Sequence, residues 1–392
     1  MPASTLSQLK STELFMNRGE EGSESEQGSH FGDTHPSIIE HRDANFLEVR
    51  ADRTMGCDLD INHGQEFMKS PLADMGAPRD IADHNEMRQK VRDVHLRLPR
   101  KPVSKRILPT ASLSIRSIPV IYQNDMGFSV RVYDPAAHNT SIRSGLRPAL
   151  IMYHGGGWTH GLPEMDEELA KFFASELRAV VVNVDYRLAP EHPFPHPMND
   201  CYTALNWTVD NAATYKIDLR RIAIWGFSSG GNLAAAVALK DCLENTTPRV
   251  KHVNLVVPVT CHPALYPPIV SSNGASAIRF GTSKEAQLPL ATMEKLWETY
   301  VASQPSHAYA SVLHTVPPEH HPSVHITVAG CDTLRDEGIA YALHLRNHGI
   351  DTQLEIIPGV PHEIDLFPRA HASKQYMMNQ VRVLNYALNT DF

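Results

Sequence analysis

The sequence predicts an α/β protein whose eight-stranded, mostly parallel sheet is flanked by helices and covered by a helical cap. Three observations lead to this prediction. Two alternating segments read as a hairpin, six later apolar runs are continuous, and helical patterns separate most of those runs. Continuous apolar runs are typical of parallel strands that are covered on both faces, so the sheet is expected to be doubly wound.

The elements follow in a regular order along the chain. The hairpin strands are expected at residues 117–122 and 128–133, around a turn at residues 124–127. The later strands are expected at residues 149–153, 179–184, 221–225, 253–259, 324–329 and 352–357. Helical periodicity predicts helices at residues 163–178, 197–214, 229–243, 335–349 and 368–388.

Three regions are expected along the 392 residues. Residues 1–50 carry nine acidic and four basic side chains in a polar stretch, which predicts an acidic leader without fixed structure. Residues 51–105 are expected to form an N-terminal helical cap segment, in which Met87, Val91 and Val94 share one helix face. Residues 106–392 form the main α/β domain, and its insertion at about residues 262–318, with a helix near 286–301, completes the cap.

Composition excludes several classes of function. Outside the acidic leader the charges nearly balance, which argues against nucleic acid or an anionic membrane as a partner. The five cysteines are scattered, in no Cys-x-x-Cys pair, which argues against a disulfide framework and structural zinc. The chain shows no signal-peptide pattern and no apolar run that would span a membrane. A cytoplasmic protein is expected, and its oligomeric state stays open, with a homodimer as one arrangement.

The strongest motif is Gly-Phe-Ser-Ser-Gly at residues 226–230. An apolar run ends at Gly226 and an alanine-rich helical pattern follows Gly230, so Ser228 is expected on a sharp strand-to-helix turn. Such a turn strains the serine backbone, and the glycines are needed because a Cβ there would collide with the crossing strand and helix. The alternative is a glycine-rich turn with no chemistry, so the rest of the chain must decide.

A serine nucleophile needs a base and an orienting acid, and both candidates follow later strands. Asp332 comes directly after the strand at residues 324–329, and His362 follows the strand at residues 352–357. The order serine, acid, histidine matches what an open α/β sheet requires if the three groups are to meet at one edge. Asp332 could instead cap the next helix, in which case Asp336 or Glu337 would be the acid.

A third feature is expected to stabilise a developing oxyanion. Three glycines follow the strand at residues 149–153, in the run His-Gly-Gly-Gly-Trp at residues 154–158. Glycines there leave backbone N–H groups free to point at negative charge, and Ser229 supplies a further N–H after the nucleophile. A flexible glycine loop is the alternative. His154 is expected to brace this loop rather than to transfer protons.

Together these motifs resemble the hormone-sensitive-lipase-like branch of the α/β-hydrolases. The resemblance rests on His-Gly-Gly-Gly-Trp, Asp-Tyr-Arg-Leu-Ala-Pro-Glu-His at residues 185–192, Gly-Phe-Ser-Ser-Gly-Gly, and Asp-Thr-Leu-Arg-Asp-Glu-Gly at residues 332–338, in that order. It covers about residues 75–390 and implies a carboxylic-ester hydrolase of the α/β-hydrolase fold. It implies Ser228, Asp332 and His362 as a catalytic triad, with oxyanion donors at Gly156, Gly157 and Ser229.

The chain departs from the family at two places. Phe227 stands where the family often has an aspartate, which removes a carboxylate beside the site. The histidine loop reads His-Glu-Ile-Asp in place of the frequent His-Gly-Phe, which changes one wall of the expected pocket. The acidic leader has no counterpart in the family pattern.

The predicted function is a serine carboxylesterase that acts through an acyl-enzyme on small-molecule esters and needs no metal or organic cofactor. Trp158 and Phe227 are expected to line a closed substrate pocket, which favours short- to medium-chain acyl groups over long ones. Two alternatives remain: an acyl-group hydrolase or transferase acting on a thioester or acetyl ester in a biosynthetic pathway, and a catalytically silent ligand-binding relative. A broader similarity to fungal esterases of secondary metabolism is a weak guide to the pathway.

Overall fold

The computed structural model of the chain describes residues 81–97, 113–122, 125–135, 145–273, 275–283, 286–301, 303–364 and 371–389. The predicted acidic leader lies outside these residues. Of the predicted N-terminal helical segment, the structure describes α2 (Ile81–Arg97).

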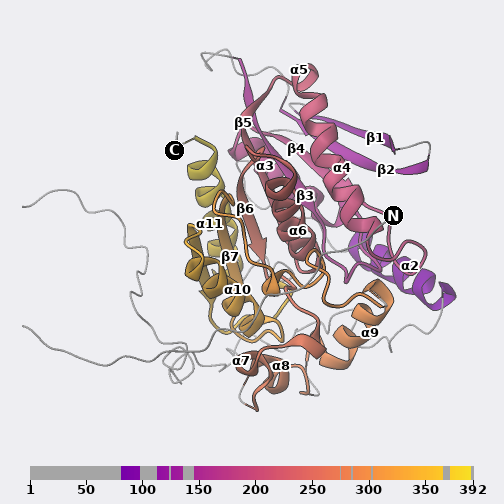
Figure 1. Cartoon of the computed structure of the whole chain (residues 1–392). Coiled ribbons are helices and arrows are strands. Elements are labelled where there is room, and N and C mark those ends of the chain that lie inside the picture. Colours follow the sequence, from indigo (N-terminus) through magenta and orange to yellow (C-terminus); the bar gives the residue numbers. More distant parts are fainter. Residues whose placement is uncertain are drawn as a thin grey trace, which may run out of the picture. The chain divides into compact units, whose positions relative to one another are not determined.

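One eight-stranded sheet forms the framework, as predicted from the sequence. Its spatial order is β1-β2-β4-β3-β5-β6-β7-β8 (Figure 1). β1 pairs with β2 and β2 pairs with β4 in antiparallel fashion, and all remaining pairs are parallel. The strands are β1 (Ser114–Tyr122), β2 (Asp125–Asp134), β3 (Arg147–Tyr153), β4 (Val180–Asp185), β5 (Ile217–Phe227), β6 (Val250–Val256), β7 (Ser323–Ala329) and β8 (Thr352–Ile357).

Helices cover both faces of the sheet. On one face α3 (Glu167–Glu176) and α11 (His371–Asn389) share a buried core with inward side chains of the strands, such as Leu150 and Trp225. On the other face lie α4 (His196–Asp210), α6 (Ser229–Glu244) and α10 (Arg335–Asn347) (Figure 1). This two-sided cover explains why the central strands are apolar without alternation.

Several element boundaries differ from the sequence prediction, and two of the differences have a local cause. The strand expected to reach Val259 ends at Val256, because Val257 has a φ of 42°, a conformation that β-branched residues rarely adopt. The helix expected over residues 197–214 is divided into α4 and the short α5 (Ala212–Tyr215). At the division the Asn211 side chain donates to the Trp207 carbonyl oxygen at 2.8 Å, in competition with the regular helix bonds.

The predicted insertion forms short helices at the end of the sheet where the parallel strands finish. They are α7 (Pro268–Ser271), α8 (Ser276–Arg279) and α9 (Leu290–Val301). The Asp336 carboxylate of α10 accepts a hydrogen bond from the Ser276 N–H at 2.8 Å, which ties α8 to the main domain. On α9, Tyr300 stacks on Trp158, with ring centroids 4.2 Å apart.

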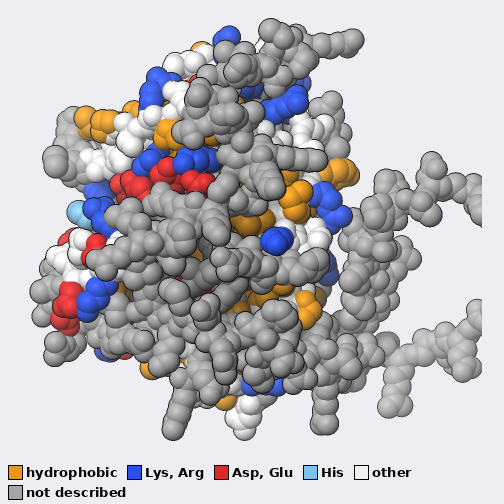
Figure 2. Space-filling view, turned by 180° about the vertical axis from the view of Figure 1, so that it is seen from behind, with side chains coloured by type: hydrophobic (Ala, Val, Ile, Leu, Met, Phe, Trp, Pro, Cys, Tyr) orange, Lys and Arg blue, Asp and Glu red, His pale blue; other side chains and the backbone are white. Residues whose placement is uncertain are grey.

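Opposite charges are interspersed on the surface. Seen from behind, Asp and Glu side chains gather beside Lys and Arg side chains on the part of the surface that Figure 2 colours. The structure also contains ion pairs between neighbouring elements: Arg131 of β2 contacts Glu164 and Glu167, and Lys171 of α3 contacts Glu167 and Glu168. Partly exposed pairs of this kind contribute about 0–1 kcal/mol each, so the apolar core beneath provides most of the stability.

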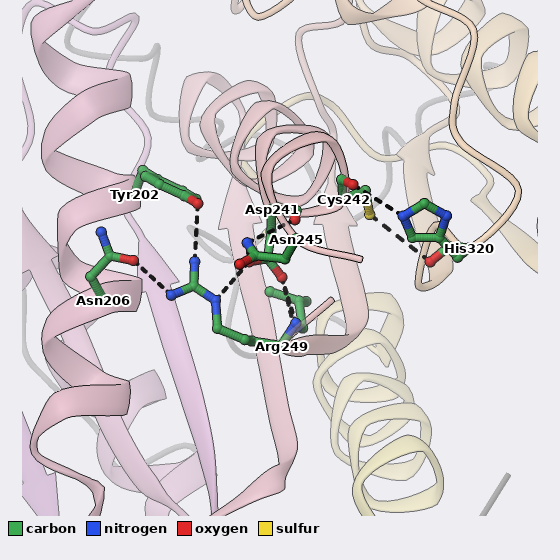
Figure 3. A network of polar contacts seen from close by, with 8 residues as sticks. Tyr202, Asn206, Asp241, Cys242, Asn245, Arg249 and His320 are labelled. Carbon is green, nitrogen blue, oxygen red and sulfur yellow. Dashed lines mark hydrogen bonds and ion pairs between the residues drawn. The ribbon is translucent and has the colours of Figure 1, made fainter. Parts of the chain in front are cut away.

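A buried ionic network joins α4, α6 and the start of β6 (Figure 3). Asp241 of α6 has no exposed surface and accepts hydrogen bonds from the backbone N–H and the Nε of Arg249, at 2.7 and 2.8 Å. The Arg249 guanidinium also donates to Asn206 at 2.7 Å and to Tyr202 at 3.1 Å, both on α4. The network therefore links α4 to the C-terminal end of α6, which is the end away from Ser228.

We expect Asp241→Ala to lower the free energy of unfolding by about 2–4 kcal/mol, because it leaves the Arg249 guanidinium and the backbone N–H groups of Arg249 and Val250 without their acceptor. Urea denaturation measures this loss. Glu244→Ala is the matched control on the same helix, and removal of its half-exposed pair with Lys240 should cost less than about 1 kcal/mol. Equal midpoints for Asp241→Ala and the unmodified chain would contradict the assigned role of the network.

Candidate active site

The turn between β5 and α6 places Ser228 at the edge of the sheet. Its backbone has φ 56° and ψ −119°, the strained conformation predicted from the motif. Two hydrogen bonds fix the turn, from the Ser228 N–H to the Val256 carbonyl oxygen at 2.8 Å and from the Val259 N–H to the Ser228 carbonyl oxygen at 3.2 Å. The end of β6 thus holds the serine from both sides.

The flanking glycines are required by close backbone contacts. A Cβ on Gly226 would lie 2.2 Å from the Gly230 carbonyl oxygen, and one on Gly230 would lie 2.0 Å from the Tyr153 carbonyl oxygen. Both distances are far below contact distance, so the strand and the helix could not approach each other with any other residue there. The sequence prediction about these two glycines is confirmed.

Three side chains from separate loops form one hydrogen-bonded row. His362 Nε2 lies 2.9 Å from Ser228 Oγ, and His362 Nδ1 lies 2.8 Å from Asp332 Oδ2. Since a carboxylate only accepts, Nδ1 carries the proton and Nε2 is left to accept from the serine hydroxyl. All three are buried, at 7% exposure for Ser228, 6% for His362 and 1% for Asp332.

The alternative acids have other partners. Asp336 is buried and accepts from the Ser276 N–H and from Arg335 Nε, each at 2.8 Å. Glu337 accepts from the Thr260 N–H at 2.6 Å and from the Tyr266 hydroxyl. Burial raises the pKa of Glu337 to about 8, so this group favours its neutral form at pH 7. Of the three candidate acids, Asp332 is the one hydrogen-bonded to His362.

The glycine loop after β3 approaches the serine, as expected. Gly156 and Gly157 have φ of 120° and 57°, both in the region that favours glycine. A Cβ on the preceding Gly155 would lie 3.4 Å from the Ser228 Cβ. Within the described part of the chain, the N–H groups of Gly156, Gly157 and Ser229 donate to no other protein group. They are available to an oxyanion.

His154 supports this loop from within. Its Nδ1 donates to the Gly155 carbonyl oxygen at 2.8 Å, and its ring stacks on Tyr186 with centroids 4.2 Å apart. The Tyr186 hydroxyl in turn donates to the His154 carbonyl oxygen at 2.8 Å. Burial lowers the pKa of His154 to about 4, so the ring is neutral at pH 7. These contacts agree with the predicted bracing role.

The two aromatic residues predicted for the pocket occupy different environments. The half-buried Phe227 ring lies 5.6 Å from the His362 ring, and a Cβ on Gly155 would lie 2.8 Å from it. Phe227 therefore lies between the glycine loop and the histidine. Trp158 has no exposed surface and is enclosed by Tyr300 and Trp297 of α9. It joins the insertion to the glycine loop, and its place in a pocket wall stays a prediction.

Two contacts between the insertion and the site loops have no signal in the sequence. Gln287 Oε1 accepts from the Glu363 N–H at 2.8 Å, directly after His362. The Thr333 hydroxyl, directly after Asp332, donates to the Leu288 carbonyl oxygen at 2.6 Å. These contacts join segments 76 and 45 residues apart, so no local motif could reveal them.

Comparisons with known proteins agree with this architecture. A family model described as alpha/beta hydrolase fold matches residues 150–366. An AB hydrolase superfamily protein of Schizosaccharomyces pombe is 32% identical over 280 residues, which are 67% of this chain and 76% of that protein. The ethyl acetate hydrolase of Pseudomonas putida is 32% identical over 241 residues, 60% of this chain and 70% of that protein.

A solved structure extends the similarity to most of the chain. A thermostable carboxylesterase cloned from a metagenomic library is 28% identical with a TM-score of 0.68, and the match covers 78% of this chain and 98% of that protein. The predicted family and fold are confirmed. The chain belongs to the α/β-hydrolase fold family, in its hormone-sensitive-lipase-like branch of esterases.

Proposed function

We propose that this carboxylic-ester hydrolase acts through an acyl-enzyme formed on Ser228. His362 Nε2 takes the proton of Ser228 Oγ as that oxygen bonds to the ester carbonyl carbon. His362 then gives the proton to the leaving alcohol oxygen, and the carbon–oxygen bond of the ester breaks. Water attacks the acyl carbon while His362 takes one of its protons, and the return of that proton to Oγ releases the acid.

Two further groups stabilise charge during these steps. The N–H groups of Gly156, Gly157 and Ser229 receive the oxyanion of each tetrahedral intermediate. Asp332 keeps the Nδ1 proton in place and stabilises the imidazolium that forms on His362. The observation that carries the proposal is the continuous row from Ser228 Oγ through His362 to Asp332, with spacings of 2.9 and 2.8 Å.

The alternatives differ from this proposal in one feature each. A catalytically silent ligand-binding relative needs no base at the serine, and the placement of His362 within hydrogen-bond distance of Ser228 Oγ supports an active enzyme. An acyl transferase would use the same row but would exclude water from the acyl-enzyme. Product analysis with an added alcohol or thiol acceptor separates hydrolysis from transfer.

Location, assembly and pathway remain predictions from the sequence. The sequence predicts that the protein is cytoplasmic, that a homodimer is one arrangement it could form, and that its pathway belongs to secondary metabolism. Among the helices that the structure describes, none is both long and apolar enough to cross a membrane.

We expect Ser228→Ala to lower kcat by about 10⁴-fold or more, because the members of a triad act as a unit. His362→Ala should have nearly the same effect. The measurement is steady-state hydrolysis of p-nitrophenyl butyrate by purified, folded variants, with fluorophosphonate labelling as a second readout. Near-normal turnover by folded Ser228→Ala would refute the mechanism.

The choice of acid has its own test. Asp332→Asn should lower kcat by about 10²–10⁴-fold, because the His362 tautomer is no longer held. Asp336→Asn should leave kcat within about threefold but cost about 1–3 kcal/mol of unfolding free energy, since Asp336 is buried and bonded to Ser276. This cost exceeds the tenths of a kcal/mol expected for an exposed first-turn carboxylate. An inactive Asp336→Asn beside an active Asp332→Asn would reverse the assignment.

We expect acetyl to hexanoyl esters to be preferred over palmitoyl esters by at least about tenfold in kcat/KM, which requires about 1.4 kcal/mol of differential binding in the transition state. The bulky Phe227 ring, 5.6 Å from the His362 ring, supports this preference, as does the similarity to an ethyl acetate hydrolase. A series of p-nitrophenyl esters measures it. Activity that rises toward palmitate, with a jump at an oil–water interface, would identify a lipase instead.

A further inference from the structure

An arginine of α2 contacts the loop that carries the oxyanion glycines. We infer that Arg88 is a positioning residue, which keeps the N–H groups of Gly156 and Gly157 pointing toward the oxyanion of the reaction. Arg88 itself lies outside the part of the chain that the family model matches. The inference rests on the proposed function, because it concerns the oxyanion site of that reaction. α2 precedes residues 150–366, the part matched by the family model.

The guanidinium of Arg88 has four acceptor residues, of which Asn85 is on its own helix and three are on two loops. Its Nε donates to the Thr159 carbonyl oxygen at 2.7 Å, and one terminal nitrogen donates to the Ala189 carbonyl oxygen at 2.8 Å. Both terminal nitrogens also contact the Glu191 carboxylate, at 2.8 and 2.7 Å. The fork of one arginine thus joins the loop after β3 to the loop after β4.

Short backbone links lead from these acceptors to the glycines. The Thr159 N–H donates to the Gly156 carbonyl oxygen at 3.2 Å, which closes a turn around Gly157 and Trp158. The Ala189 N–H donates to the Trp158 carbonyl oxygen at 2.9 Å. Arg88 therefore bonds to Thr159, which closes the turn that contains Gly157. It also bonds to Ala189, which holds the middle of the same turn at Trp158.

The turn needs outside support because its backbone is strained. Trp158 has a φ of 60°, which is uncommon for a residue with a bulky side chain. Conformations of this kind persist only where the surroundings hold them. The planar guanidinium of arginine can donate hydrogen bonds to several carbonyl and carboxylate oxygens at once. The ammonium of lysine is a compact point charge and cannot replace this geometry.

The same contacts contribute little to global stability. The Arg88 and Glu191 side chains are 23% and 31% exposed, and solvent screening keeps the contribution of such an ion pair to global stability small. Loss of Arg88 is therefore expected to affect the position of the donors more than the folded fraction. A small displacement of catalytic groups by a remote change can cost about 10²-fold in rate.

The test compares Arg88→Ala with Lys90→Ala, a control on the same helix whose side chain is 54% exposed and pairs with Glu86. Active sites are counted by fluorophosphonate titration, and kcat and KM for p-nitrophenyl butyrate are expressed per titrated site. We expect Arg88→Ala to lower kcat by about 10- to 100-fold with KM within about threefold, and Lys90→Ala to leave both unchanged. Arg88→Lys should resemble Arg88→Ala.

A transition-state analogue gives a readout that a merely structural role would not change. The hemiketal of a trifluoromethyl ketone places an oxyanion on the same donors, so its inhibition constant should rise in proportion to the fall in kcat/KM of Arg88→Ala. A kcat per titrated site within about twofold of the unmodified enzyme, for Arg88→Ala or, if that variant does not fold, for Arg88→Lys, would overturn the inference. Activity that survives in Ser228→Ala would overturn the proposed function instead.

Discussion

The site depends on one backbone conformation, the left-handed turn at Ser228. With φ at 56°, the chain leaves β5 and enters α6 so abruptly that the serine stands at the sheet edge. The turn is tolerated because Gly226 and Gly230 have no Cβ and because the end of β6 bonds the serine backbone on both sides. The strand order then brings the loops after β3, β7 and β8 to the same edge, where the glycines, Asp332 and His362 lie.

The segment between β6 and β7 and the helix α2 contact different loops of this site. The insertion contacts the loop that carries Asp332 through Ser276 and Leu288, and the histidine loop through Gln287. α2 contacts the glycine loop through Arg88, while α9 packs Tyr300 against Trp158 of that loop. These contacts restrain the loops that carry Asp332, His362 and the glycines, because they join them to segments distant in the sequence.

Burial also sets the charges around the reacting row. His154 is held neutral beside the glycine loop, because burial lowers the pKa of its ring to about 4. The pKa of Glu337 is raised by burial and, to a lesser degree, by the nearby Asp332 charge, so the neutral form avoids a second carboxylate next to the acid. Asp332 is thus left as the carboxylate that faces His362.

The sequence by itself determined the fold class, the eight strands to within a few residues, and the residues of the hydrogen-bonded row. These follow from periodicity and from glycines with local steric roles, which depend on near neighbours in the chain. The sequence alone left Asp336 and Glu337 open as acids, whereas tertiary structure bonds these two to Ser276 and Thr260 and bonds Asp332 to His362. It also decided the partners of Arg88, because contacts between segments 71 and more residues apart depend on how packed elements are placed and not on any local pattern.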